Sequence, residues 1–301
     1  MNVHIFEVPM DFGASRHGSD MGPSAIRLAG LKRRLEALGH TTVDSAPLNL
    51  KPQEYSTPGT HTLRYLSPIV RGCCQLAQAV EESIEKKEFP IILGGDHSIV
   101  LGSVAGITAA TKKQEKKVGV LYVDAHGDFN TPETSPSGNI HGMCMSASCG
   151  IGVSELTNLY YEGIKIDPKN VCYVGCRDID PGEKKLMHNA GVKMFTISDI
   201  DRLGINNVMQ KVVDFFKTRV DLIHISFDID VLDPQFAPGV GIQVPYGMTP
   251  REGFFLMEEM NATNMVCSCD IVEVNPVLDN RNLTAKTAVD LLARLLGDKL
   301  Y

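Results

Sequence analysis

The sequence predicts an α/β fold built on a mostly parallel β-sheet. Short apolar runs alternate with helical patterns along the whole chain, which is typical of βαβ units. Several of these runs are almost continuously apolar, as expected for strands that are covered on both faces. We therefore expect eight strands, near residues 3–8, 40–45, 90–94, 118–123, 171–176, 192–197, 221–227 and 268–274.

Helices between these strands are indicated by the spacing of apolar residues and by residues that favour helix ends. A first helix is predicted over residues 23–38, where leucines recur every three or four residues between an opening Pro and a closing Gly. A second apolar stripe covers residues 69–84. Thr249 begins a capping-box pattern with Pro at the first helical position. The last helix is expected at about residues 284–296.

The bulk properties favour one soluble, compact domain over residues 1–301, since repeats, low-complexity tracts and flexible linkers are absent. Membrane association is not expected, because the longest apolar runs are much shorter than a membrane span. A net charge of -7 without a Lys/Arg cluster disfavours nucleic-acid binding and favours cationic ligands. Eight cysteines without a CxxC pair, and an N-terminus unlike a signal or transit peptide, favour a reduced, cytoplasmic protein.

Potential metal ligands follow three of the predicted strands. In parallel sheets, ligands bind at the carboxyl ends of strands, and alternate residues of an extended segment point to the same side. Side chains at these three ends are therefore expected to converge. The six candidates are His97, Asp124, His126, Asp128, Asp228 and Asp230.

A metal centre is the simplest explanation of these six residues. The segment from Asp124 to Asp128, taken alone, is as typical of a solvated turn as of a ligand set. Several carboxylates buried together without a cation are costly, and six ligands exceed what one four-coordinate ion needs. Oxygen and imidazole ligands favour Mn²⁺, leave Zn²⁺, Fe²⁺ and Co²⁺ open, and suit Mg²⁺ or Ca²⁺ less well. Two ions about 3.5 Å apart would activate water, so hydrolysis is the implied chemistry.

Two further histidines receive different interpretations. His141 lies in the loop that follows the Asp124 segment, so we expect it at the same edge of the sheet, where it is placed to move protons. His224 lies inside a predicted strand and is interpreted as a hydrogen-bonded core residue.

Four motifs, in this order, resemble those of the ureohydrolases: GGDHS (94–98), DAHGD (124–128), SGNIHG (137–142) and SFDIDVLDP (226–234). The resemblance covers nearly the whole chain and is closest to the arginases, which hydrolyse L-arginine to L-ornithine and urea at a binuclear manganese centre. It implies a three-layer α/β/α fold with an eight-stranded, mostly parallel sheet. It also implies two Mn²⁺ ions per subunit and a homotrimer.

The resemblance also implies roles for the individual residues. One manganese would bind His97, Asp124, Asp128 and Asp228, and the other would bind His126, Asp124, Asp228 and Asp230. A bridging hydroxide, oriented by Asp128, would attack the guanidinium carbon. His141 resembles the proton-shuttling histidine of the family, and Glu273 resembles the glutamate at the guanidinium end of the pocket. Asp128, His141 and Glu273 are thus the expected catalytic residues.

Substrate binding is expected in the loop after Asp128 and in a segment near residue 180. Small neutral donors in the loop suit a carboxylate, either directly or through water. Asp180 resembles the acid that faces the α-amino group in arginases, and Glu183 lies close behind it in the sequence. A turn would explain part of this composition but not its match to the family in spacing and order. The candidates are Asn130, Thr131, Ser135, Ser137, Asn139, Asp180 and Glu183.

One segment departs from the family pattern and keeps an alternative open. Arginases commonly carry Gly-Thr-Pro where this chain has Gly-Ile-Gln at residues 241–243. The expected substrate is L-arginine, and the alternative is agmatine or another guanidino compound. A binuclear phosphohydrolase is disfavoured because no Lys/Arg cluster or phosphate-binding glycine loop accompanies the ligands. A non-catalytic metal-bound scaffold is disfavoured by the presence of His141 and Glu273.

Overall fold

The computed structural model describes residues 1–299, so the last two residues of the predicted domain lie outside the described part. All eight predicted strands form one sheet with the order β2-β1-β5-β10-β9-β6-β7-β8, and every neighbouring pair is parallel. The strands are β1 Asn2–Val8, β2 Thr41–Asp44, β5 Phe89–Gly94, β6 Val118–Val123, β7 Val171–Val174, β8 Lys193–Phe195, β9 Leu222–Asp228 and β10 Val266–Val272.

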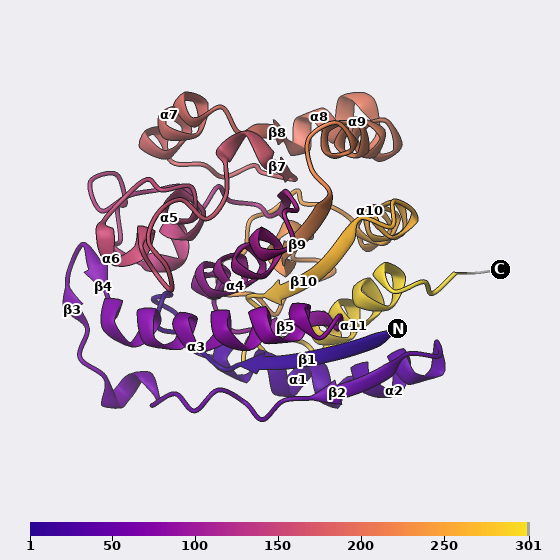
Figure 1. The fold of residues 1–301 in the computed structure, drawn as a ribbon, viewed down its shortest axis with the longest axis horizontal. Coiled ribbons are helices and arrows are strands. Elements are labelled where there is room, and N and C mark those ends of the chain that lie inside the picture. Colours follow the sequence, from indigo (N-terminus) through magenta and orange to yellow (C-terminus); the bar gives the residue numbers. More distant parts are fainter. Residues whose placement is uncertain (300–301) are drawn as a thin grey trace.

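Helices cover both faces of this sheet (Figure 1), and each helical layer encloses its own cluster of buried apolar side chains. The layer that covers one face contains α1 Gly22–Leu28, α2 Leu31–Ala37, α8 Ile197–Leu203, α9 Ile205–Lys217, α10 Pro250–Ala262 and α11 Leu283–Leu295. The opposite layer contains α3 Leu66–Glu85, α4 Val100–Lys113, α5 Cys144–Ser148, α6 Ser154–Thr157 and α7 Pro181–Ala190. The predicted three-layer α/β/α fold is confirmed.

The helix predicted over residues 23–38 is wrong in one respect, because the chain forms two helices there. Gly30 separates α1 from α2 with a φ of 98°, a left-handed conformation that glycine adopts at little cost. The break leaves Leu28 86% exposed, while Leu31 and Leu35 are buried. The other predicted helices are present, and Thr249 caps α10 with the expected capping box.

A second sheet of two short strands, β3 Gly59–Thr60 and β4 Leu63–Arg64, was not predicted. Its strands contain two residues each, which is too short for any alternation of apolar and polar residues to be recognised. Within residues 1–299, no helix has both the length and the apolar character needed to cross a membrane. The eight cysteines are free thiols.

The strand order brings the predicted ligands together. Strands β5, β10, β9 and β6 are consecutive in the middle of the sheet, so the loops that follow them meet at one edge. Gly95 lets the loop after β5 pass close to the loop after β1, because a Cβ atom at this position would lie 1.9 Å from the Met10 carbonyl oxygen. Residues 96–98 therefore lie against the N-terminal loop as well as the sheet edge.

Candidate metal centre

The six predicted ligand residues form two groups that meet at Asp124. The first group surrounds His97, whose Nδ1 lies close to a carboxylate oxygen of Asp124 (3.0 Å), Asp128 (3.1 Å) and Asp228 (3.2 Å). In the second group, His126 Nδ1 lies 3.0 Å from Asp230 Oδ2 and 3.4 Å from Asp124 Oδ1. The two oxygens of Asp124 therefore face different groups, as expected for a carboxylate that bridges two ions.

The burial and charge of these groups fit divalent cations. Asp124 Oδ2 is buried and makes no hydrogen bond within the described residues. Burial, together with the charges of Asp230 and Asp128, raises the pKa of Asp124. Burial and the charges of Asp230 and Asp124 raise the pKa of Asp228 well above its ordinary value. Carboxylates destabilised in this way are relieved by a cation, and the oxygen and imidazole donors suit a transition metal such as manganese.

A buried hydrogen-bond network orients His97. Ser226 donates its hydroxyl hydrogen to Asp270 Oδ1 at 2.6 Å, so the Ser226 oxygen accepts from His97 Nε2 at 2.8 Å. This arrangement places a hydrogen on Nε2, so Nδ1, which faces the carboxylates, is the nitrogen that would bind a metal once it is deprotonated. His224 also bonds Asp270, at 3.0 Å, and is fully buried, in agreement with its interpretation as a core residue.

Two carboxylates at the site lie on left-handed backbone. Asp128 has a φ of 49° and Glu273 has a φ of 63°, conformations that are costly for residues other than glycine. Hydrogen bonds hold both segments, because the Asp128 carbonyl accepts from Met145 N at 3.0 Å and Glu273 N donates to the Gly95 carbonyl at 2.8 Å. Such strain is common where a side chain must be aimed at a functional site.

A pocket of about 210 Å³ opens above the two ligand groups. Among the described residues, no Lys or Arg lines it, while seven carboxylates and two histidines do, so the pocket suits a cationic ligand. The carboxylates are Asp128, Asp178, Asp180, Glu183, Asp228, Asp230 and Glu273, and the histidines are His126 and His141. Of these residues, Asp178 was missed in the sequence, where the segment near residue 180 drew attention only to Asp180 and Glu183.

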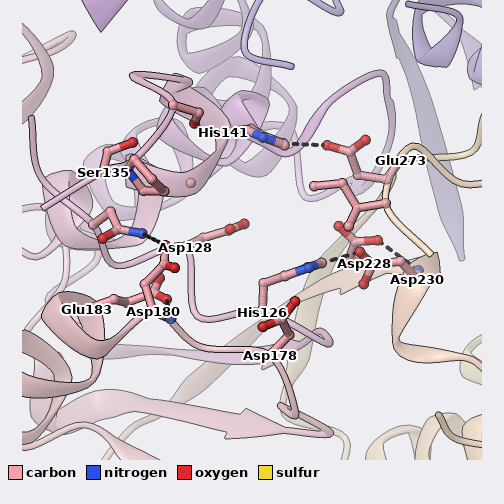
Figure 2. Close-up of a pocket in the computed structure, with 15 residues that line it drawn as sticks. His126, Asp128, Ser135, His141, Asp178, Asp180, Glu183, Asp228, Asp230 and Glu273 are labelled. Atoms are coloured by element: carbon pink, nitrogen blue, oxygen red, sulfur yellow. Dashed lines mark hydrogen bonds and ion pairs between the residues drawn. The ribbon is translucent and has the colours of Figure 1, made fainter. Parts of the chain in front are cut away.

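The two sides of the pocket are formed by different parts of the fold. Figure 2 shows one side with Ser135, Asp180 and Glu183, and another with His126, Asp228 and Asp230. Ile242 adds an apolar side chain to the lining, at the segment where the sequence departs from the family pattern. The pocket thus combines the two candidate ligand groups with a separate polar wall, which contains Ser135, Asp180 and Glu183.

Residues at the N-terminus of α7 connect this polar wall to the loop that follows Asp128. Asp180 and Glu183 form the capping box that begins α7. Glu183 Oε1 also accepts from Phe129 N at 2.6 Å, and Asp180 Oδ2 accepts from the Asn130 amide at 3.0 Å. Burial raises the pKa of Glu183 to about 8, although hydrogen bonds from the backbone oppose the shift. Asp180 and Glu183 therefore hold the two residues that directly follow Asp128.

Five of the seven predicted substrate-binding residues line the pocket, and two lie beside it. Asn130, Ser135, Ser137, Asp180 and Glu183 are at the surface of the cavity. Thr131 N donates to Thr134 Oγ1 at 2.9 Å within the loop. Asn139 donates its side-chain amide to Ser15 Oγ at 2.9 Å, which joins the loop to the N-terminal segment.

His141 and Glu273 point toward each other at one edge of the pocket (Figure 2), with His141 Nδ1 3.1 Å from Glu273 Oε1. The same Glu273 oxygen accepts from His97 N at 2.9 Å. Burial alone would lower the pKa of His141, but the hydrogen bond and charge of Glu273, with the charges of Asp128 and Asp96, raise it to about 9. In the metal-free protein the imidazole is therefore protonated at neutral pH and able to donate a proton.

We expect the pKa of His141 in the metal-free protein to fall when Glu273 is replaced by glutamine. In the native protein the ring should titrate near pH 9. Because this value lies above the ordinary 6.5, the proton on His141 stabilises the fold fully below pH 6.5, and the contribution is lost as the pH rises through about 9. NMR titration of the ring, assigned with His141→Asn, measures the shift.

In the Glu273→Gln variant, the His141 ring should titrate at a clearly lower pH than in the native protein. The reason is that the largest attractive charge is gone while burial remains. Glu155→Gln, at an exposed position of α6, serves as the control and should leave the titration unchanged. An identical titration in Glu273→Gln and the native protein would contradict the role assigned to this ion pair.

The fold and the site together define a class: an enzyme-like α/β protein with a candidate two-metal centre at the carboxyl ends of parallel strands. The Arginase family model matches residues 1–297. The arginase of Bacillus caldovelox is 44% identical over 299 residues, which cover 99% of each chain. The crystal structure of arginase from Bacillus cereus has a TM-score of 0.94 and 42% identity over 100% of both chains.

A more distant structure extends the comparison to a bound ligand. The arginase of Entamoeba histolytica, solved in complex with L-ornithine, has a TM-score of 0.90 and 34% identity, with 99% of each chain covered. The chain belongs to the arginase family and is a hydrolase of that family. The resemblance seen in the four sequence motifs is confirmed.

Proposed function

We propose that this protein hydrolyses L-arginine to L-ornithine and urea with two Mn²⁺ ions per subunit. The observation that carries the proposal is the acidic pocket above two groups of His and Asp ligands that share Asp124. It is supported by relatives named arginases that match 99% of the chain. The L-ornithine in the Entamoeba histolytica complex is the amino-acid product of the proposed reaction.

The six ligand residues would hold the two ions as the family resemblance implies. When bound, the ions would act as Lewis acids and lower the pKa of water toward neutrality. The resulting hydroxide would be the nucleophile. One ion would be held by His97, Asp124, Asp128 and Asp228, and the other by His126, Asp124, Asp228 and Asp230. Asp128 lines the pocket directly, so its carboxylate would also orient the attacking oxygen and accept the proton that this oxygen loses when urea forms.

Glu273 and His141 would act on the guanidinium group and the leaving amine. Glu273 lines the pocket beside the ligand groups, where its carboxylate would attract and orient the guanidinium. The ornithine amine needs a proton as the C–N bond breaks. His141, held protonated by Glu273 at 3.1 Å, would donate that proton and recover it from solvent.

The polar wall would bind the amino-acid end of the substrate. Asp180 would accept hydrogen bonds from the α-amino group, with Glu183 behind it fixing the start of α7. Asn130, Ser135 and Ser137 would bind the α-carboxylate directly or through water. Thr131 and Asn139, which lie beside the pocket, would contribute by holding the loop in place.

The proposal also covers the setting of the reaction. We propose one catalytic domain over residues 1–301, supported by the single large sheet and by relatives of matching length. A cytoplasmic location is supported by the eight free thiols, since disulfides are rare in reducing compartments. A homotrimer is proposed from the family resemblance, and light scattering coupled to size-exclusion chromatography would test it.

Urea release with added Mn²⁺ tests the proposed function directly. L-arginine, agmatine and other guanidino compounds should be compared, and urea is expected from L-arginine above all others. The alternative, a ureohydrolase for agmatine or another guanidino compound, is favoured by the apolar Ile242 in the pocket lining and would give urea mainly from that compound. An absence of urea from every compound, with both metal positions filled, would overturn both proposals.

A further inference from the structure

Tyr122 is a fully buried residue of β6 that lies directly against one of the two ligand groups. It precedes Asp124 by two residues and has no exposed surface. Its ring stacks on the His97 imidazole, with the ring centroids 4.6 Å apart and an angle of 6° between the planes. The side chain is therefore packed on all sides and covers one face of a candidate metal ligand.

The Tyr122 hydroxyl lies between the two ligand atoms that distinguish this group from the other. It donates to Asp128 Oδ2 at 2.7 Å and lies 3.0 Å from His97 Nδ1. These same two atoms face each other at 3.1 Å. The ligands of the second position, His126 and Asp230, make no hydrogen bond with Tyr122 among the described residues.

We propose that Tyr122 is a positioning residue that selectively raises the affinity of the metal position formed by His97 and Asp128. The inference rests on the metal centre of the proposed function. Tyr122 is not part of the ligand pattern, and it would act on one metal position rather than on both.

The direction of the effect follows from the hydrogen-bond inventory. A neutral phenol has one hydrogen to donate, and Ser226 already fixes the proton of His97 on Nε2. With a metal at His97 Nδ1, the Tyr122 hydrogen belongs to Asp128 Oδ2. That bond fixes the rotamer of a carboxylate on left-handed backbone without adding a positive charge that would repel the ion.

A second tyrosine provides a matched control in the adjacent strand. Tyr173 of β7 is paired in register with Tyr122, is equally buried, and has its ring centroid 5.0 Å away. Its hydroxyl makes no hydrogen bond within residues 1–299. Tyr122→Phe and Tyr173→Phe therefore remove the same atom from neighbouring buried rings, but only the first removes a contact to a ligand.

Titration of the metal-free full chain with Mn²⁺ tests the proposal, with free Mn²⁺ followed by its EPR signal. Two binding steps are expected for the native protein. Tyr122→Phe should weaken one step by roughly 10- to 100-fold, the range for loss of a hydrogen-bond partner of a metal ligand, and leave the other step unchanged. Tyr173→Phe should leave both steps unchanged. Thermal unfolding of each metal-free variant checks that it folds.

Three results would overturn the proposal: an unchanged titration in Tyr122→Phe, an equal loss at both steps, or the same loss in Tyr173→Phe. The last two would indicate a general effect on the fold. If the native protein binds no Mn²⁺, the proposed function fails together with this inference. If the native protein binds two ions and releases urea from L-arginine while Tyr122→Phe binds as the native protein does, only the inference fails.

Discussion

Replacing Asp228 with asparagine should abolish most of the activity and at the same time stabilise the metal-free protein. Asp228 is 2% exposed and lies at the end of β9, where it is the proposed second bridging ligand. Its pKa is raised well above the ordinary value by burial and by the charges of Asp230 and Asp124. The ionised form of Asp228 is therefore disfavoured in the metal-free fold, and the neutral amide removes that cost.

The asparagine keeps the local structure, because its carbonyl oxygen can accept the hydrogen bond that Asp228 Oδ1 now accepts from Asp230 N at 2.8 Å. Loss of a charged ligand should reduce urea release from L-arginine by about 1000-fold or more, which corresponds to about 4 kcal/mol of transition-state stabilisation. The melting temperature without metal should rise. The further rise on adding Mn²⁺, which reports binding to the folded state, should largely disappear.

Urea assays and thermal unfolding with and without Mn²⁺ measure these effects. Asp221→Asn is a control from the opposite end of β9, where the exposed carboxylate accepts from Lys117 N at 2.8 Å. This variant should retain native turnover and native stabilisation by Mn²⁺. Urea release by Asp228→Asn within a few-fold of the native rate would refute the two-metal site.

The clustering of the six candidate ligands was predictable because it depends largely on local rules. Each candidate follows a recognisable apolar strand, and parallel strands place their carboxyl ends on the same edge. The strand order, which the sequence does not show, then decides that these strand ends are close to one another. The structure brings five of the six residues into two groups that share Asp124, and Asp128 joins the first group at 3.1 Å from His97 Nδ1.

The supporting groups were not predictable in the same way, since they depend on which strands are neighbours. Tyr122 lies within an apolar run and is indistinguishable in sequence from any other core aromatic. Ser226 reaches both His97 and Asp270 only because β9 lies next to β10 and near β5. The break at Gly30 was missed for a related reason: a continuous leucine pattern predicts a helix, and only packing decides that the glycine interrupts it.

The second large effect concerns the choice between L-arginine and agmatine, which differ by the α-carboxylate. No Lys or Arg from residues 1–299 lines the pocket, so neutral donors must recognise this group. Ser135 Oγ accepts from Gly138 N at 3.0 Å and Ser137 Oγ accepts from Asn139 N at 3.2 Å. Because both hydroxyl oxygens accept from backbone N–H groups, both hydroxyl hydrogens remain for a ligand.

We therefore expect kcat/KM for L-arginine to exceed that for agmatine by about 100-fold or more, since hydrogen bonds to a charged group contribute about 1.5–3 kcal/mol each. Ser137→Ala should lower kcat/KM for L-arginine by roughly 10- to 100-fold and leave the value for agmatine unchanged, because agmatine has no carboxylate to lose contact with. Agmatine is thus the internal control in steady-state urea assays of both proteins. Two results would contradict carboxylate binding by this loop and favour the alternative substrate class. They are equal kcat/KM values for the two substrates in the native protein, or an equal loss of kcat/KM for both substrates in the variant.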